Sequence, residues 1–393
     1  MNSKYQQCCS NRHDKKSNYK RSQKKSQYQQ QDPNYRIFIW CEQITYQIHS
    51  IIYYTTLMNT NSVLIDTHNL PIPHDGEVHN GKVRSVYWQG DIGYMVISDR
   101  ISAFECTWES ESGLKGIPGK GAALNAIAKY WFDEFALKGL AGNHIIDVPH
   151  PLVWKVKRAQ PIMIEAIARQ YITGSMWRDY EKGQRIFGGV TMPDGLQKDQ
   201  KLDQLLITPS TKGIIRNIAD IPEMDDVNIT QKQILDNYQA FGFHSKEDVY
   251  LYEKLLADGF NLISQKLETL GKIFVDTKFE FGYIDGQIKY IDEIGTPDSS
   301  RYWTKELYNL GQTVEESKEK FRQDLINSVP DKDVLLNKER MEERVALSKS
   351  FKVPDKVFEE TSALYKKLAA DITGIDLPET YDVQKEIIES INL

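Results

Sequence analysis

The sequence has few cysteines, and their placement limits the chemistry that the chain can carry. Three of the four, Cys8, Cys9 and Cys41, lie near the N-terminus, which leaves Cys106 alone in the rest of the chain. Residues 58–393 can therefore form no internal disulfide, as is typical of proteins from a reducing compartment, and we expect a cytoplasmic location. The chain also has no CxxC pair, no HExxH and no cluster of His and Cys, which argues against a zinc site.

Common nucleotide-binding motifs are absent as well. The sequence contains neither GxxxxGK[ST] nor GxGxxG, and it has no HRD…N loop and no DFG. The first two absences leave a GK pair at residues 81–82 without the context of a P-loop. The last two argue against a protein kinase.

Positive charge is concentrated at one end of the 393 residues. The formal net charge is −6, from 49 Lys and Arg against 55 Asp and Glu. Residues 1–57 hold 9 of the basic and 3 of the acidic residues, a charge of +6, so residues 58–393 carry −12. An acidic body argues against a general nucleic-acid binder, whose surface is basic. Hydrophobic residues make up 40% of the chain, enough to bury a sizeable core.

The N-terminal segment differs from the rest in composition. Residues 1–36 are rich in Gln, Ser, Lys and Asn without an apolar period, which predicts disorder. Residues 37–57 are more apolar, but Glu42 and His49 argue against a membrane span. A transit peptide fits the basic character but not the glutamine tract. We expect Met58 to be the physiological start, and the residues before it to be an extension outside the functional protein.

The residue patterns predict an α+β protein. VRSVYWQ and GYMVISD are typical of strands, and apolar residues from Leu124 to Phe135 recur at helical spacing. Further along the chain we expect strands on both sides of Pro161, loops over 183–230, a helix at about 246–270, a hairpin at 273–294 turning at Asp285-Gly286, and helices at Leu335–Lys349 and Pro354–Ala370. The expected segments are a leader at 1–57, a β-rich lobe at 58–160, a central lobe at 161–303 and a helical region at 304–393.

The hairpin carries an unusual set of charges. Asp276, Lys278 and Glu280 are spaced by two, so they project from one face of a strand that looks central. Charges on a central strand are costly unless they are paired or bound to a ligand. Carboxylates with a lysine between them suit Mg²⁺ and a phosphate, although a solvated strand face is the plainer interpretation.

The hairpin register bears on a shared metal ion. A two-residue turn at Asp285-Gly286 would set Glu280 opposite Ile291, with Asp292 on the other face. A three-residue loop or a bulge would set Glu280 opposite Asp292. A metal ion shared by Glu280 and Asp292 therefore predicts the second arrangement.

Small cationic or hydroxyl-rich turns recur at the ends of the expected strands. They contain Lys82 and Arg84, Arg169 and Ser175, Lys212, and, after the hairpin, Asp298 and Arg301. Each is an ordinary turn or helix cap when taken alone. Together they are typical of sites that bind phosphates, with arginine as a bidentate clamp. The GKG before the 124–135 helix is interpreted as a plain helix start.

The same segments resemble those of the SAICAR synthetase (phosphoribosylaminoimidazole-succinocarboxamide synthase) family. The matching stretches are GKVRSVYW, VISDRISAFE, IPGKGAALN, MIEAIARQYITGSMWRDYEKG, LLITPSTKG, VDTKFEFG and IDEIGTPDSSRYW, in the order of the family and spanning residues 81–303. The resemblance implies a two-lobed α+β fold, ATP-grasp-like or kinase-like, with ATP in the cleft. It also implies a carbon–nitrogen ligase of purine biosynthesis that joins L-aspartate to the carboxylate of CAIR, 5-amino-1-(5-phosphoribosyl)imidazole-4-carboxylate. ATP and Mg²⁺ would take part, and ADP, phosphate and SAICAR would be the products.

The resemblance also implies roles for individual residues. Lys82, Arg84 and Lys212 would contact ATP, with Ala159–Ile164 as the hinge against adenine. Lys278 would bridge ATP and the CAIR carboxylate. The implied Mg²⁺ ligands are Glu280 and Asp292, and the implied substrate-binding residues are Arg169, Ser175, Asp298, Arg301 and Glu105. Arg301 would also act in catalysis, and Glu105 stands where many members of the family have Asp.

Two other functions remain open from the residues alone. A small-molecule kinase would use the same ATP and Mg²⁺ parts, and it would differ in forming ADP without both CAIR and aspartate. A binding module would use the basic leader to tether the body to RNA or to another acidic surface. The expected partners are small molecules rather than nucleic acid or membrane, and the sequence leaves a homo-oligomer open.

Overall fold

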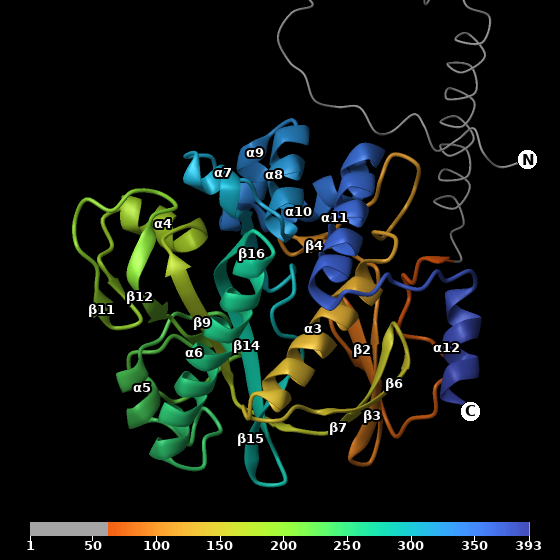
Figure 1. Cartoon of the computed structure of the whole chain (residues 1–393), viewed down its shortest axis with the longest axis horizontal. Helices are drawn as coiled ribbons and strands as arrows, with labels where there is room; N and C mark the ends of the chain where they lie inside the picture. The colour runs from red at the N-terminus through yellow and green to blue at the C-terminus, as the bar shows by residue number, and fades with distance from the viewer. Residues whose placement is uncertain (1–61, 393) are drawn as a thin grey trace, which may run out of the picture. The chain divides into compact units, whose positions relative to one another are not determined.

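Strands of the computed structural model, which describes residues 62–392, fall into two main antiparallel sheets (Figure 1). The predicted leader lies outside the described residues. The first sheet has the order β1-β2-β3-β7-β6, formed by His79–Asn80, Arg84–Gln89, Ile92–Ile97, Val153–Lys157 and Ile145–His150. A small separate pair follows β3, with β4 at Ser102–Ala103 and β5 at Cys106–Thr107.

The second sheet is built around one long strand. This strand, β14 (Lys272–Ile284), pairs with β9 (Ile164–Tyr171), β15 (Gln287–Ile291), β16 (Ser300–Thr304) and β8 (Gln160–Pro161). Two further strands, β12 (Lys201–Ile207) and β13 (Ser210–Thr211), pair with β9, and a separate two-stranded pair consists of β10 (Ile186–Phe187) and β11 (Val190–Thr191). The central position of β14 agrees with the expectation from its sequence.

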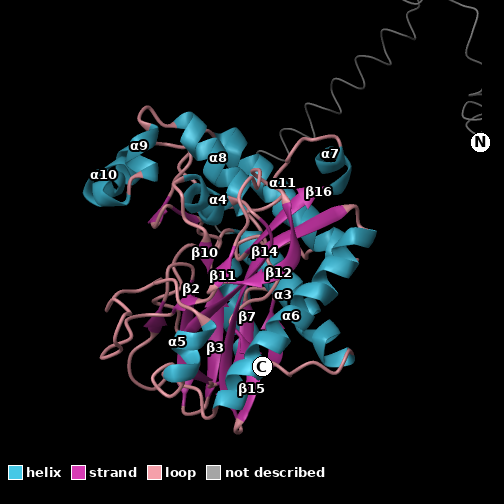
Figure 2. Ribbon diagram, turned by 90° about the vertical axis from the view of Figure 1, so that its left-hand side faces the viewer, coloured by secondary structure: helices cyan, strands magenta, loops and turns pink. Residues whose placement is uncertain are grey.

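Helices cover the sheets and extend to the C-terminus. In chain order they are α3 (Lys120–Leu137), α4 (Gly174–Glu181), α5 (Gln231–Asp236), α6 (Lys246–Thr269), α7 (Lys305–Asn309), α8 (Lys318–Ser328), α9 (Lys332–Leu336), the 3₁₀ turn η2 (Lys338–Arg340), α10 (Met341–Ser350), α11 (Asp355–Thr373) and α12 (Val383–Ile391). Helices α8 to α10 gather at the end of β14 opposite the β14–β15 turn (Figure 2). No helix among the described residues is long and apolar enough to cross a membrane.

Most of the expected elements are confirmed, including the α+β class, the helices at α3 and α6, the Asp285-Gly286 hairpin and the helical C-terminal region. Two expectations are wrong. The stretch 183–230 is not all loop, because β12 buries Leu202 and Leu206 while pairing with β9. The helix expected at Leu335–Lys349 is interrupted at Asn337, whose extended backbone and side-chain bond to the Glu339 amide start a new turn.

One hydrophobic core joins the two sheets through α3 and α6. On α3, Phe135 is fully buried and packs its ring against Phe279 of β14 and Tyr290 of β15. On α6, Phe260 packs against Phe274 of β14. Residues 62–392 accordingly belong to one compact unit, and the division into lobes at 160 and 303 stays a prediction. Phe274 and Phe279 both face this core because the pairing of β14 with β16 shifts register between Phe274 and Asp276. Beyond that shift, the residues that alternate with Phe279 lie on the other face of the strand.

Truncating the Phe135 side chain tests how much its packing in this core contributes to the stability of the fold. We expect Phe135→Ala to lower the free energy of unfolding by about 3–5 kcal/mol, since a buried aromatic side chain leaves a cavity that the core cannot close. Urea denaturation followed by circular dichroism measures the change. Leu137→Ala is the matched control on the same helix, because Leu137 is 78% exposed. Equal losses from the two substitutions would contradict this packing.

Candidate active site

Three charged side chains occupy the face of β14 that points away from the aromatic core. Asp276, Lys278 and Glu280 follow a register shift between Phe274 and Asp276 in the pairing with β16, and from there they alternate along β14 and so share that face. Asp276 and Glu280 are buried, with relative exposures of 4% and 6%. Because buried charges are costly without partners, the neighbours of these three residues decide how the face is stabilised.

Asp276 holds two arginines from the flanking strands. In the strand pairing it lies opposite Arg169 of β9 on one side and Arg301 of β16 on the other. Its Oδ2 accepts from Arg169 Nη1 at 3.2 Å and also from Arg301 Nη1. Gly174, at the start of α4 with a φ of 57°, makes room for this group, since a Cβ there would come within 2.6 Å of Arg301 Nη2. The arrangement presents two predicted substrate-binding arginines side by side.

A small cavity adjoins Arg169. It has a volume of about 180 Å³, and Ser175 at the start of α4 and Thr208 after β12 also line it. The side chain of Arg169 is fixed by a bond from its Nε to Thr208 Oγ1 at 2.9 Å. The structure thus brings the predicted pair Arg169 and Ser175 to one cavity.

Lys278 lies among carboxylates. Its Nζ is 2.6 Å from Glu165 Oε1 on β9 and 3.6 Å from Glu280 Oε1. Glu280 also accepts a hydrogen bond from Lys212, which follows β13. Burial by itself lowers the pKa of Lys278, but Glu280 and Glu165 outweigh it and raise that pKa, so the ammonium stays charged.

The hairpin register differs from the one that a shared metal ion predicted. Ile284 pairs with Gln287 across a two-residue turn, so Glu280 lies opposite Ile291 rather than Asp292. Asp292 nevertheless does not continue the strand, because its φ is 60° and β15 ends at Ile291. This left-handed residue breaks the alternation of faces, and the charge of Asp292 acts on Glu280. The predicted register is therefore wrong, although the two carboxylates still interact electrostatically.

The pKa values of the two acids move in opposite directions. Burial and the charge of Asp292 raise the pKa of Glu280, with Lys212 and Lys278 offsetting part of the rise. Burial also acts to raise the pKa of Asp292, but Arg84, Lys212 and Lys278 outweigh it and lower that pKa. Two interacting carboxylates next to cations can exchange these partners for a cation of higher charge.

Arg84 links the two sheets. It begins β2 in the first sheet, and its guanidinium donates to Asp292 Oδ1 and, at 2.6 Å, to Glu293 Oε2 after β15 in the second. Thr296 Oγ1 donates to the same Glu293 oxygen at 2.9 Å. A predicted ATP-binding residue thus lies against a predicted metal ligand.

Asp298 is placed away from solvent, in a cluster of its own. Its carboxylate lies 2.9 Å from Lys120 Nζ and 3.3 Å from Lys318 Nζ, and it accepts from Tyr365 Oη at 2.5 Å. Burial acts to raise the pKa of Asp298, but the two lysines outweigh it and lower the pKa strongly. Lys120, interpreted from sequence as part of a plain helix start, is therefore also a buried ion-pair partner.

Lys82 and Glu105 stand apart from these clusters. Both are exposed, and neither forms an ion pair with another described residue. Glu105 and the preceding Phe104 have φ values of 67° and 53° in the turn between β4 and β5. Two successive left-handed residues without glycine are uncommon, and such backbone strain tends to persist at functional sites.

Sequence reasoning missed three residues that the structure brings to this region: Glu165, Lys318 and His144. For Glu165 a signal existed, since Glu165 and Arg169 are four apart on one strand and so share a face. Lys318 and His144 lie far along the chain from their neighbours, and no local pattern marks them.

The carboxylates of this region suit a metal ion that takes only part of its coordination shell from the protein and the rest from a bound phosphate and water. Among residues 62–392 no three His, Cys, Asp or Glu side chains are grouped so as to hold a metal by themselves. Glu280 and Asp292 could contribute two carboxylate oxygens. Mg²⁺ commonly takes one or two carboxylates and completes its shell with phosphate oxygens and water.

Comparison with known proteins places these features in context. The family model described as SAICAR synthetase matches residues 77–338. Phosphoribosylaminoimidazole-succinocarboxamide synthases of Shewanella baltica and Shewanella oneidensis are each 54% identical over 353 residues, which cover 84% of this chain and 96% of the relative. Among solved structures, the SAICAR synthase of Saccharomyces cerevisiae complexed with SAICAR has a TM-score of 0.59 at 25% identity, covering 80% of this chain and 98% of that one. A SAICAR synthetase in complex with ADP has a TM-score of 0.52 at 19% identity, over 77% and 100% of the two chains. These likenesses confirm the fold expected from the resemblance.

His144 gives the site a pH-dependent neighbour. It is 4% exposed, its ring packs against Phe132 and Trp154, and neither ring nitrogen has a partner among the described residues. Burial, only partly offset by Asp292 and reinforced by Arg84, lowers its pKa from 6.5 to about 4. Between these values the unfolded chain binds the proton and the folded chain does not, so His144 makes the fold less stable as pH falls below about 6.5.

Replacing His144 tests this account. When the pH is lowered from 7 to 5, the free energy of unfolding should fall in both proteins, and we expect the fall to be about 2 kcal/mol smaller in His144→Phe than in the wild type. The reason is that phenylalanine fills the apolar site without taking up a proton. Urea titrations at the two pH values measure the difference. His79→Phe, at an exposed position of β1, controls for the loss of a histidine. Parallel pH dependence of His144→Phe and wild type would contradict the account.

Proposed function

The chain belongs to the SAICAR synthetase family, and we infer that it is the ATP-dependent ligase that joins L-aspartate to CAIR, giving SAICAR, ADP and phosphate in purine biosynthesis. The match with synthases over 96% of their length carries this conclusion. A small-molecule kinase, which the residues alone left open, is thereby set aside. The clusters on β14 supply the parts that such a ligase requires.

Amide formation from a carboxylate requires an activated acyl group. In the proposed path a carboxylate oxygen of CAIR attacks the γ-phosphorus of ATP, and the bond to the bridging oxygen breaks to release ADP. The amine of aspartate then attacks the acyl carbon of the resulting acyl phosphate. Phosphate leaves and the nitrogen loses a proton, which completes the amide. Positioning and neutralisation of charge supply most of the catalysis in such phosphoryl transfers.

We propose that Lys278 lies at the centre of the first step. Its ammonium remains charged among Glu165 and Glu280, and it can turn from these carboxylates toward the oxygens that gain charge during transfer. Arg301, which pairs with Asp276 on the same face of β14, would stabilise the same charge. A lysine pre-paired with carboxylates on a rigid strand needs little reorganisation when substrates arrive.

The ATP phosphates would lie between the two sheets. We propose that Lys212 and Arg84 turn from Glu280 and Asp292 to the phosphates, with exposed Lys82 reaching from the turn before β2. Glu280 and Asp292 would hold Mg²⁺, whose chemistry is to neutralise the oxygens of the transferred phosphoryl group. The segment Ala159–Ile164, which contains β8, would face adenine.

CAIR would bind beside Arg169 and Arg301, the two arginines that donate to Asp276. We propose that Arg169, Ser175 and Arg301 hold CAIR, with its phosphate on Arg169 beside Ser175, because a guanidinium and a helix start suit that anion. Glu105 stays a proposed substrate contact from the strained turn. The burial of Asp298 between two lysines favours a role in positioning Lys318 and the loop after β15 over a contact with substrate.

Other features of the protein remain proposals. We propose a cytoplasmic location, from the scarcity of cysteine in residues 58–393. We propose that small molecules rather than nucleic acid or membranes are its partners, and that residues 1–57 take no part in catalysis. A homo-oligomer is compatible with these proposals. The lobes would meet near residue 160, where the chain passes from the first sheet to the second.

Two substitutions test the assigned site. We expect Lys278→Ala and Asp292→Asn each to lower kcat for SAICAR formation by at least a hundredfold, because each removes charge needed at the transferred phosphoryl group. A coupled ADP-release assay with CAIR and aspartate measures the change. Asn tolerates the left-handed backbone of position 292, so the fold should persist, as circular dichroism would show.

Two matched controls come from the exposed ion pair at the hairpin turn, Lys157 and Asp285. Lys157→Ala and Asp285→Asn should retain activity within about twofold of the wild type. Near wild-type turnover in Lys278→Ala or Asp292→Asn would refute the site assignment, while leaving the family membership untouched.

A further inference from the structure

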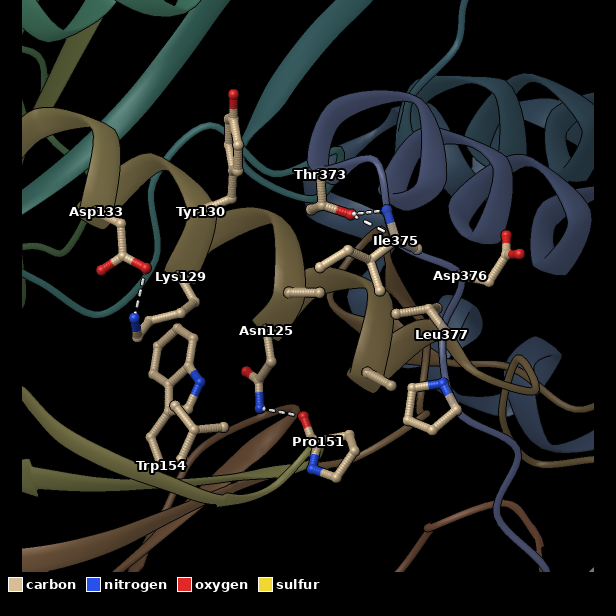
Figure 3. Close-up of a pocket in the computed structure, with 14 residues that line it drawn as sticks. Asn125, Lys129, Tyr130, Asp133, Pro151, Trp154, Thr373, Ile375, Asp376 and Leu377 are labelled. Atoms are coloured by element: carbon tan, nitrogen blue, oxygen red, sulfur yellow. Dashed lines mark hydrogen bonds and ion pairs between the residues drawn. The ribbon is translucent and has the colours of Figure 1, made fainter.

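Helices near the C-terminus are attached to the N-terminal part of the described chain at several places. The end of α11 and the connection after it face α3 across a pocket (Figure 3). Earlier in α11, Ser362 Oγ donates to the carbonyl oxygen of Pro118, just before α3, at 2.6 Å. After α10, the amide of Val353 donates to the carbonyl oxygen of Glu109 at 2.9 Å. Helix α10 is thereby held against β5 and the segment that follows it.

Arg344 of α10 is a buried arginine whose hydrogen-bond partners among residues 62–392 include no carboxylate. Its side chain belongs to a residue that is only 3% exposed. Nε donates to the carbonyl oxygen of Val334 at 3.0 Å, and Nη2 donates to that of Asn337 at 2.7 Å. Nη1 donates to the carbonyl oxygen of Phe104 at 3.5 Å. The planar fork of the guanidinium therefore joins the α9–η2 segment to a distant part of the chain.

The distant partner of Arg344 lies in the strained turn between β4 and β5. Phe104 and Glu105 form this two-residue turn with φ values of 53° and 67°. Residues other than glycine keep such a backbone only where their surroundings fix it. On one side, the carbonyl oxygen of Ala103 accepts from Trp108 Nε1 at 2.9 Å. On the other, the carbonyl oxygen of Phe104 accepts from Arg344, so the turn is held at two successive carbonyls.

We propose that Arg344 is a positioning residue, which fixes the Phe104–Glu105 turn so that the exposed Glu105 carboxylate meets CAIR. This inference rests on the proposed function, in which Glu105 contacts substrate. Arg344 is itself too buried to reach a substrate, so its effect passes through the turn. It also lies beyond residues 77–338, which the family model matches. Substrate binding therefore depends on a helix outside that range.

A double-mutant cycle tests whether Arg344 acts through Glu105. Steady-state kinetics of the full chain, by coupled ADP release, measure the KM for CAIR in Glu105→Ala, in Arg344→Met and in the double variant. Methionine keeps an apolar stem and removes the donors. Each single substitution should raise the KM for CAIR about tenfold, because each loses the same charged contact. We expect kcat, and the KM values for ATP and aspartate, to stay within about twofold of the wild type.

The double variant distinguishes positioning from an independent effect on stability. If Arg344 acts through Glu105, its KM for CAIR should also rise about tenfold, whereas independent effects would multiply to about a hundredfold. Hydrogen exchange followed by mass spectrometry adds a readout apart from activity. The amides of residues 102–107 should exchange faster in Arg344→Met than in the wild type.

Arg340→Met is the matched control from the same helical region. Its guanidinium pairs with Asp331, Asp333 and Glu343 instead of with the turn. The substitution should leave the KM for CAIR within about twofold of the wild type and the exchange of residues 102–107 unchanged.

The thermal unfolding midpoint shows whether each variant is folded. If Arg344→Met fails to fold, Arg344→Lys takes its place in the cycle, since it keeps the charge but not the planar fork, and it should raise the KM for CAIR at least about threefold. A wild-type KM for CAIR in the folded Arg344 variant, or multiplied effects in the double variant, would overturn the proposal.

Failure of the inference can be told apart from failure of the proposed function. An unchanged KM for CAIR in Glu105→Ala would overturn the role of Arg344 while leaving the ligase assignment in place. A wild-type chain that forms no SAICAR from ATP, CAIR and aspartate would refute the proposed function and this inference with it.

Discussion

Charges buried on the central strand β14 must be neutralised, and this requirement organises the functional half of the molecule. Asp276 is neutralised by arginines from both neighbouring strands, Lys278 by Glu165, and Glu280 by Lys212. The pairs join β9, β16 and the segment after β13 to β14, so the same contacts that satisfy the charges also bring distant segments together. Buried ion pairs of this kind contribute little net stability, whereas losing one partner is costly. Under the proposed function they form a set of cations and carboxylates that would exchange partners with a nucleotide and a substrate.

The aromatic side of β14 makes this possible. Phe135 of α3 and Phe260 of α6 pack against Phe279 and Phe274, and these contacts keep the strand rigid and shielded. The two faces of this strand therefore differ, with apolar packing on one side and the charged residues on the other. Arg84 extends the arrangement to the first sheet by pairing with Asp292 and Glu293. A nucleotide that displaces Arg84 from these acids would act on both sheets at once.

Much of this could be predicted from sequence where short-range patterns decide the structure. The helical spacing from Leu124 to Phe135, the Asp285-Gly286 turn and the period of two at 276–280 all correspond to elements of the fold. The register prediction was wrong because the position of Asp292 depends on one left-handed residue rather than on turn length. The burial of Asp298 between Lys120 and Lys318, and the pairing of Lys278 with Glu165, depend on contacts between distant residues that no local pattern encodes. The motifs of the family predicted the residues of the site, and the tertiary contacts determine which of them are in reach of one another.

The central claim is that this face activates the CAIR carboxylate by phosphoryl transfer, so the fate of a carboxylate oxygen is its most direct test. CAIR labelled with ¹⁸O in the carboxylate is converted with ATP, Mg²⁺ and aspartate, and the products are measured by mass spectrometry. An acyl phosphate intermediate predicts that one ¹⁸O appears in the released phosphate and one stays in the amide carbonyl of SAICAR. Unlabelled phosphate accompanying SAICAR formation would contradict the account.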